Sequence, residues 1–248
     1  MQIEKHDRAL VILAVIAIAI SLVQLCTARG DEAFMAARVM TVHGMTPTGA
    51  PKENLLLVGH LYTLSLDPET KVATWCSYRA RAADAASRNA PARNWINTLP
   101  DVTLESSDYR GPEYDIGHLV PLATFKASAY AFELNFMGNC APQRPNLNRG
   151  PWLKVETRIR ELTAEFEFVD VVVGPLFETD QPKLPAADES HRVPSAFFAV
   201  IKPKKPTKNR GPPTCYIVPQ SVERLDAIDQ FAVSIDEVQR RSGLQFPK

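Results

Sequence analysis

The apolar residues of the chain gather in short runs that turn-forming residues separate. Runs rich in Val, Ile, Phe and Tyr predict strands, and they cover residues 55–66, 73–78, 169–173, 196–201 and 215–218. Asp67-Pro68 separates the first two, and Gly174-Pro175 ends the third. Several strands with few helices predict an α+β fold built on a central mixed or antiparallel sheet.

A different period follows Pro151, which is a favoured residue in the first turn of a helix. Apolar residues then recur at steps of three and four, at Trp152, Val155, Ile159, Leu162 and Phe166. At ~100° per residue they fall in one arc. Glu156 and Arg160 lie just beside its edge, so we expect both side chains at the rim of the core, where they reach a cleft.

A second helix is predicted over residues 234–242. Ser234 and Glu237 form a capping box, and Gly243 ends the pattern. By contrast, residues 79–112 are rich in Arg, Ala, Asn and Pro and show weak periodicity, which indicates a long surface excursion. Long loops in compact domains are often functional.

The N-terminus resembles a targeting segment. Lys5 and Arg8 precede an apolar run over residues 9–25, and small residues follow up to Ala28. This is the layout of an export signal, but the run is also long enough to span a bilayer if it is not cleaved. A buried core helix is disfavoured because the run has no polar face. Residues 1–28 therefore predict a signal peptide or a membrane anchor on an exported protein, secreted, periplasmic or membrane-tethered.

The rest of the chain predicts one folded domain. Residues 29–54 carry Gly and Pro without a sustained period, so we expect a linker or arm. Residues 55–248 then form one domain of about 200 residues, enough for a real core. Outside the targeting segment three cysteines remain, which permit at most one disulfide within a monomer, and no Cys/His cluster has zinc spacing.

Charge limits the choice of partner. Lys and Arg together number 28, and Asp and Glu together also number 28, so the formal net charge is zero at pH 7. A protein of this composition that binds nucleic acid must concentrate positive charge locally. The Pro-rich stretch 202–213 carries several Lys and Arg residues, and it fits either a nucleic-acid patch or a solvated basic loop.

Residues 115–156 combine the groups that phosphodiester hydrolysis requires. His118 lies where a strand meets a turn, and a neutral imidazole takes up a proton near physiological pH. Asn148 comes immediately before the helix that carries Glu156 and Arg160. Magnesium stabilises phosphoryl oxygens and often takes only one or two protein oxygens, and arginine binds phosphate through paired hydrogen bonds. A base, a metal ligand and a phosphate contact would thus meet at one place.

These residues resemble the DNA/RNA non-specific endonucleases of the ββα-metal superfamily. That family's signature is Asp-Arg-Gly-His-Leu-Ala-Pro, and residues 115–121 are Asp-Ile-Gly-His-Leu-Val-Pro. Its downstream block matches residues 139–143 (NCAPQ) and 147–156 (LNRGPWLKVE). Further matches lie at residues 75–79, 173–177, 193–198 and 242–246. The resemblance covers roughly residues 55–246 and implies a ββα-metal catalytic motif.

The resemblance also implies roles for the polar residues that match. These are a general base at His118, the sole direct Mg²⁺ ligand at Asn148, orientation of the metal's waters by Glu156, phosphate contacts by Arg79 and Arg160, and shaping of the metal site by Asn139. Mn²⁺ is a possible substitute for the metal. Because the implied nucleophile is an external water, the 2′-OH is not needed and both DNA and RNA are expected substrates.

One departure from the signature stands at Ile116, where the family has an arginine that supports phosphate binding. Arg110 is a nearby substitute. Two other interpretations stay open from the residues alone: Asn148 as a helix cap, and Glu156 as a surface residue paired with Arg160. Two rival functions follow from Ile116: a phosphodiesterase with another substrate, and a catalytically impaired, membrane-tethered nucleic-acid-binding protein.

Overall fold

A computed structural model describes residues 43–87, 92–204 and 213–247. The apolar run 9–25 and the centre of the basic stretch 202–213 lie outside the described residues. Among the residues that the structure describes, no helix is long and apolar enough to cross a membrane.

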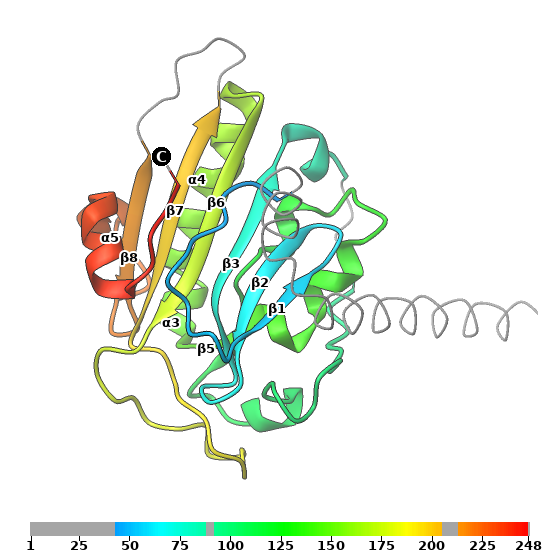
Figure 1. The fold of residues 1–248 in the computed structure, drawn as a ribbon, viewed down its shortest axis with the longest axis vertical. Coiled ribbons are helices and arrows are strands. Elements are labelled where there is room, and N and C mark those ends of the chain that lie inside the picture. The colour runs from blue at the N-terminus through cyan, green and yellow to red at the C-terminus, as the bar shows by residue number, and fades with distance from the viewer. Residues whose placement is uncertain (1–42, 88–91, 205–212, 248) are drawn as a thin grey trace, which may run out of the picture. The chain divides into compact units, whose positions relative to one another are not determined.

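The core of the fold is a seven-stranded sheet in the order β1-β2-β3-β6-β7-β8-β9. Figure 1 shows the strands from β1 to β8. All neighbours pair antiparallel. The strands are β1 (Leu55–Val58), β2 (Tyr62–Asp67), β3 (Val72–Ala80), β6 (Phe168–Leu176), β7 (Ala196–Lys204), β8 (Thr214–Pro219) and β9 (Ala232–Val233). The predicted α+β class and the antiparallel form of the sheet are confirmed.

The first apolar run is a hairpin rather than one strand. β1 and β2 pair from Leu55 opposite Leu66 to Val58 opposite Thr63. Between them the Gly59 N–H donates to the carbonyl oxygen of Tyr62 over 2.9 Å. The prediction of a single strand over residues 55–66 was wrong because Leu61 continues the apolar character through the turn, so hydrophobicity alone does not reveal the reversal.

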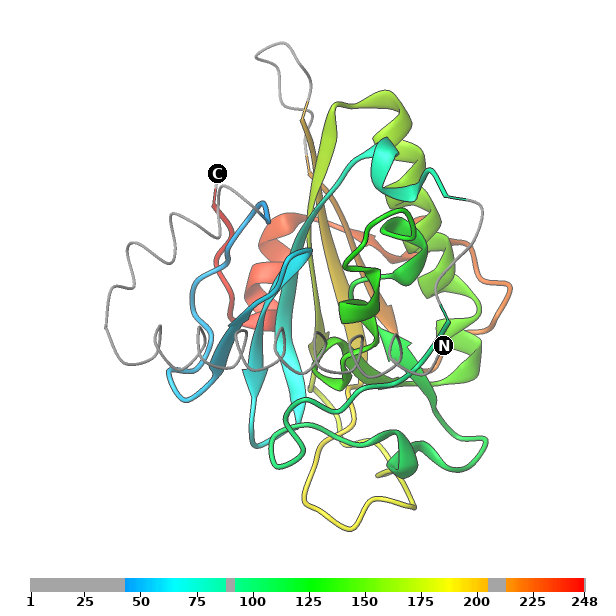
Figure 2. The same ribbon diagram turned by 90° about the vertical axis from the view of Figure 1, so that its right-hand side faces the viewer.

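Helices cover both faces of the sheet. Trp152, Val155 and Ile159 of α4 (Pro151–Glu165) are buried against one face, together with Val171 of β6. Val172 points to the other face, as alternation along a strand requires, and packs in a second cluster under α5 (Ile235–Ser242). Figure 2 shows α4 and α5 on opposite sides of the sheet. The predicted apolar arc of α4 is thus its core-facing surface.

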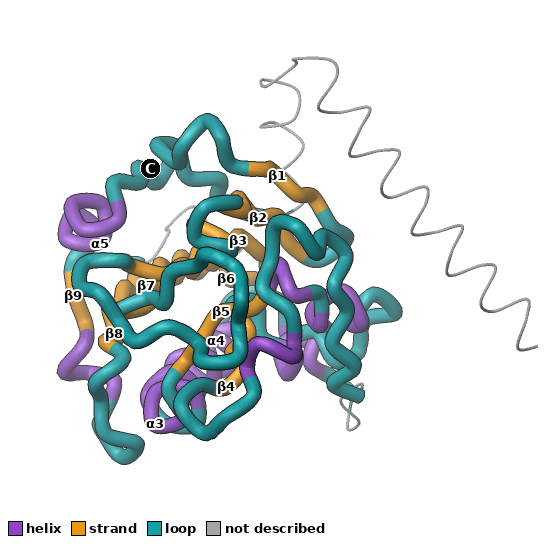
Figure 3. Tube along the Cα trace, turned by 90° about the horizontal axis from the view of Figure 1, so that it is seen from below, coloured by secondary structure: helices purple, strands orange, loops and turns teal. Residues whose placement is uncertain are grey.

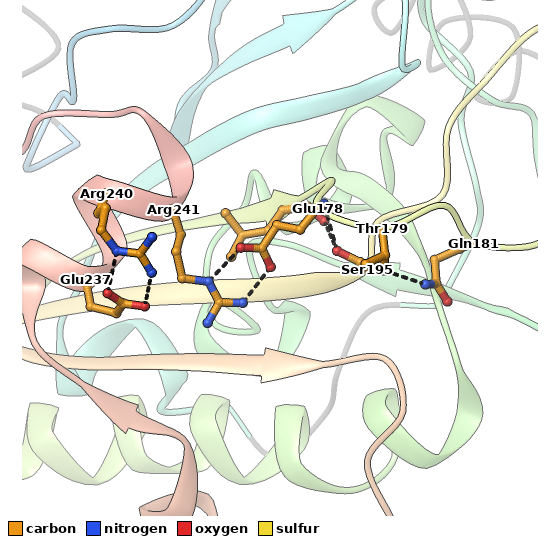
Figure 4. A network of polar contacts seen from close by, with 8 residues as sticks. Glu178, Thr179, Gln181, Ser195, Glu237, Arg240 and Arg241 are labelled. Carbon is orange, nitrogen blue, oxygen red and sulfur yellow. Dashed lines mark hydrogen bonds and ion pairs between the residues drawn. The ribbon is translucent and has the colours of Figure 1, made fainter.

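Polar contacts fix α5 at its predicted ends. The Ser234 side chain accepts a hydrogen bond from the Glu237 N–H over 3.1 Å, and Gly243 adopts a left-handed φ of 73° that ends the helix. Arg241 forms a bidentate ion pair with the Glu178 carboxylate: Nε donates to Oε1 over 2.7 Å, and Nη2 donates to Oε2 over 2.5 Å. Figure 4 shows this pair, which joins α5 to the chain just after β6.

The folded body begins before residue 55. Residues 43–54 lie against the sheet: Met45 is buried in the cluster under α5, and Thr48 and Gln245 exchange two backbone hydrogen bonds. The expected linker over 29–54 is therefore corrected for its second half. Backbone pairing, hydrogen bonds that involve Ser77 and Asn54, and the buried Met45 hold this segment. None of these contacts produces a hydrophobic period that a sequence pattern reveals.

The three cysteines of the described chain are buried free thiols at Cys76, Cys140 and Cys215. Burial raises the pKa of the Cys215 thiol to about 11 and moves the pKa of the other two upward as well. They remain protonated and pack as small apolar side chains.

Candidate active site

A small ββα unit stands beside the main sheet. Strand β4 (Asp115–His118) pairs antiparallel with β5 (Cys140–Gln143), and the short helix α3 (Pro145–Asn148) leads into α4. Figure 3 shows β4, β5, α3 and α4 close together. A Cβ at Gly117 would collide with the Gln143 side chain, so the pairing needs a glycine there. The base and the metal ligand predicted from sequence thus belong to one compact unit.

His118 ends β4 with its imidazole held in one orientation. Its Nε2 lies 3.3 Å from Oδ1 of Asn135, and the Nδ2 of that amide donates to the Ala92 carbonyl over 2.9 Å. Because the bond to Ala92 fixes which end of the amide faces His118, we assign the imidazole proton to Nε2. Nδ1 then keeps its lone pair and is the basic atom. The Trp95 ring lies 5.0 Å from the imidazole, between centroids.

The electrostatics keep His118 neutral. Burial lowers the pKa of His118 to about 4, and the Arg93 charge lowers it further, while the hydrogen bond with Asn135 opposes both. A buried imidazole loses the hydration that stabilises its cation. His118 is therefore unprotonated at neutral pH, which is the form that a general base requires.

Asn139 shapes the backbone that follows His118. Its side-chain Oδ1 accepts from the Val120 N–H, and its Nδ2 donates to the carbonyls of Val120 and Leu134, all between 2.9 and 3.0 Å. The side chain is completely buried. All three partners are backbone groups, so the Asn139 side chain holds the turn that follows His118. It forms no hydrogen bond with another candidate side chain of the described chain.

Asp115 joins β4 to the chain before α4. Its Oδ2 accepts from Nδ2 of Asn148 over 2.9 Å and from Nε of Arg149 over 2.8 Å, while Oδ1 pairs with Nη2 of Arg149 at 2.5 Å. Asn148 ends α3, and Gly150 is the cap of α4. The interpretation of Asn148 as the cap of that helix was therefore wrong. Its Nδ2 is occupied, and within the described residues its Oδ1 accepts no hydrogen bond.

Glu156 and Arg160 lie one turn apart on α4. Arg160 Nη1 is 3.9 Å from Glu156 Oε2, so the pair that the i,i+4 spacing allows does form, although loosely. Burial raises the pKa of Glu156 to about 7, and the Arg160 and Arg93 charges oppose that rise. The two arginine charges offset only part of the effect of burial on Glu156. Further positive charge near this carboxylate would therefore favour its ionised form.

Arg79 does not join this group. Its Nε and Nη2 donate to the two Asp170 carboxylate oxygens over 2.6 and 3.0 Å, and its guanidinium lies 3.8 Å from the Phe168 ring centre. The preceding residue, Tyr78, packs in the cluster under α4. Because side chains alternate along β3, Arg79 points to the opposite face. Its predicted phosphate contact is corrected: Arg79 is part of a structural ion pair.

Another arginine, Arg93, acts electrostatically on the candidate site. It is exposed, and its charge lowers the pKa of both His118 and Glu156. It lies in the long excursion 79–112. That excursion has several arginines and no period that singles one out, so the expectation that long loops carry function was the only available signal.

The departure at Ile116 has a local explanation. Ile116 is partly buried and packs, with Trp95, against a small apolar cluster that includes Tyr109 and Tyr114. An apolar residue therefore suits this cluster. Arg110 is exposed just after a short 3₁₀ helix, and in the described part of the chain it contacts none of the other candidate residues. The structure thus gives no support to Arg110 as a substitute.

We predict that His118 titrates far below an ordinary histidine. In metal-free protein its ring signals, followed by NMR and assigned with His118→Asn, should give a midpoint near pH 4. The unfolded chain, with a histidine pKa near 6.5, binds a proton more readily than the folded chain. Stability from this residue is therefore present above pH 6.5 and is lost as the pH falls toward 4. A midpoint of 6.5 or higher would contradict the buried, neutral imidazole.

Comparison with known proteins agrees with this geometry. The model of the DNA/RNA non-specific endonuclease family matches residues 44–248. A nuclease of Serratia marcescens is 34% identical over 208 residues, which are 80% of this chain and 76% of that protein. Human mitochondrial endonuclease G is 31% identical over 199 residues, or 75% of this chain and 67% of its own. A solved EndoG/EndoGI complex shares the fold, with a TM-score of 0.71 and 23% identity over 85% of this chain and 90% of that one. The chain therefore belongs to the DNA/RNA non-specific endonuclease family of phosphodiester hydrolases.

Proposed function

We propose that this nuclease works with one hydrated Mg²⁺ held by Asn148, and that His118 activates the attacking water. The observation that carries the proposal is the tie from Asp115 to Asn148. It sets the candidate ligand beside the strand that ends in His118. Catalytic roles for Glu156 and Arg160, and for Arg93 in place of Arg79, belong to the same proposal.

The donor set fits magnesium. Mg²⁺ takes oxygen ligands and usually keeps several waters, so one protein ligand is sufficient. The Asn148 amide offers Oδ1, since its Nδ2 is bound to Asp115. Within the described residues no three His, Cys, Asp or Glu side chains gather as a cage, so the residues suit a hydrated ion better than a fully protein-bound one. Positive charge there would also favour the ionised form of Glu156.

The side chains supply the remaining chemistry. Nδ1 of His118 accepts the proton of a water that attacks phosphorus, while Asn135 holds the ring. Bound magnesium supplies positive charge that stabilises the phosphoryl oxygens and the leaving oxygen. The guanidinium groups of Arg93 and Arg160 bind and orient the phosphate. Because the nucleophile is water, the 2′-OH plays no part, which accounts for activity on both DNA and RNA.

A second candidate function rests on Ile116. Position 116 carries no cation, unlike the family signature, because Ile116 packs there against an apolar cluster. This favours either a narrower choice of phosphodiester or binding with reduced turnover. Export, with residues 1–28 as a cleaved signal or a retained anchor, is likewise proposed from the sequence of the N-terminus.

The function is tested with the full-length chain in mild detergent, incubated with plasmid DNA and with RNA. We expect cleavage of both polymers with Mg²⁺, no cleavage in chelator, and a rate lower by about 10²–10⁴-fold in His118→Ala, since that is the usual contribution of a general base. Asn148→Ala should raise the Mg²⁺ concentration needed for half-maximal activity. Thermal unfolding of each variant checks its fold.

The results separate the candidates. If the wild type cleaves neither polymer with Mg²⁺ or Mn²⁺, the nuclease mechanism proposed here is wrong. Binding without cleavage supports the impaired protein, and cleavage of a small phosphodiester alone supports the narrower substrate. If Ile116→Arg then restores cleavage of the polymers, the missing cation was the cause.

The two arginines give a matched pair of variants. Arg93→Gln should lower kcat/KM by roughly 10²-fold, the usual effect of removing one group that stabilises transition-state charge, and leave urea unfolding unchanged because Arg93 is exposed. Arg79→Gln leaves the Asp170 carboxylate without its partner. It should lower the free energy of unfolding by about 1–3 kcal/mol and change kcat/KM little. The reverse pattern would return Arg79 to the active site.

A further inference from the structure

Two aromatic side chains form an exposed stack outside the catalytic unit. The His60 and Tyr130 rings are parallel, with 3.7 Å between centroids and 3° between planes. The His60 side chain is 50% exposed and Tyr130 is 42% exposed. They come from different parts of the chain, the β1–β2 turn and the segment before the 3₁₀ helix Ala131–Asn135. The pair therefore presents flat aromatic surface to solvent.

A buried carboxylate holds this stack rigidly. Glu133 is 6% exposed; its Oε2 accepts from the His60 backbone N–H over 2.9 Å, and its Oε1 lies 2.5 Å from His60 Nδ1. A Cβ at Gly59 would come within 2.9 Å of Oε2, so the turn leaves room for the carboxylate. Burying a carboxylate is costly, and here its oxygens orient an exposed imidazole. The bonds from Glu133 therefore orient the exposed imidazole of His60 and contribute little to the packing of the core.

The stack lies close to the proposed reaction centre. Tyr130 comes directly before the 3₁₀ helix whose last residue, Asn135, contacts His118. At about 2.0 Å per residue, the backbone of Tyr130 lies roughly 10 Å from that of Asn135 along the helix axis. Ala131 and Leu134 of the helix pack in the same cluster as α4. The stack is therefore attached to a helix on the α4 side of the sheet, the side on which the same helix reaches His118.

We propose that His60 and Tyr130 form a stacking platform for an unpaired base of the substrate strand, next to the nucleotides that the catalytic unit holds. The inference rests on the proposed function, because it takes nucleic acid as the substrate. Every base has a π-face, so stacking on an aromatic ring binds a strand without reading its sequence. Such contacts suit a non-specific nuclease of zero net charge, whose affinity gains little from long-range attraction.

The test uses the full-length chain with Tyr130→Leu, Tyr130→Phe and His60→Ala. Substrates are a single-stranded DNA oligonucleotide, its duplex, and bis(p-nitrophenyl) phosphate, which reaches only the catalytic centre. Tyr130→Leu and His60→Ala should each raise KM for the single strand by about 5- to 50-fold, in line with the loss of one stacked base. KM for the duplex should rise less, and cleavage of the small ester should not change. Tyr130→Phe keeps the ring and should retain the wild-type KM.

Leu225→Ala is the matched control, since Leu225 is 89% exposed and belongs to neither site; it should change nothing. The platform is refuted if Tyr130→Leu leaves KM for the single strand unchanged, if duplex and single strand suffer equally, or if only the thermal midpoint falls. Anisotropy of a fluorescent single strand in chelator measures binding without catalysis. A wild type that cleaves no substrate but binds the strand, with weaker binding in Tyr130→Leu, would overturn the proposed mechanism and support the platform.

Discussion

The tie between the Asp115 carboxylate and the residues before α4 is the interaction on which the site depends. The carboxylate accepts hydrogen bonds from the Asn148 amide and from two nitrogens of Arg149. These bonds join strand β4 to the residues just before α4. The strand carries His118 at its other end, and the helix carries Glu156 and Arg160. One carboxylate thus sets the register between the base and the proposed metal ligand, which come from segments about thirty residues apart.

Positive charge is placed locally in a chain whose total charge is zero. Arg93 and Arg160 both act on Glu156, whereas the Arg79 charge is neutralised by Asp170 on the far face. Burial pushes the pKa of His118 down and that of Glu156 up. Added positive charge would favour the ionised form of Glu156 and would keep His118 neutral. This is the electrostatic state that a hydrated cation and a phosphate would complete.

The sequence predicted the features that depend on hydrophobic periodicity and on motifs. It missed the features that depend on which face of the sheet a side chain occupies. The α4 helix, its buried arc and the place of His118 at a strand end follow from spacing and signature residues. Arg79 stands in a matching block, yet alternation along β3 turns it away from α4. Arg93 lies in a loop without period, and its effect on the pKa of His118 and Glu156 comes from the tertiary fold, which no local pattern encodes. For the same reason the packing of residues 43–54 was not foreseen.

The most direct test of this account is the affinity of the metal-free protein for Mn²⁺, followed by EPR in the wild type and in Asp115→Ala. If Asp115 positions Asn148, the Mn²⁺ dissociation constant should rise by about 10- to 100-fold, as expected when a group that orients a metal ligand is removed. Asn148→Ala should weaken binding at least as much. Unchanged Mn²⁺ affinity in a folded Asp115→Ala variant would contradict the central role of this carboxylate.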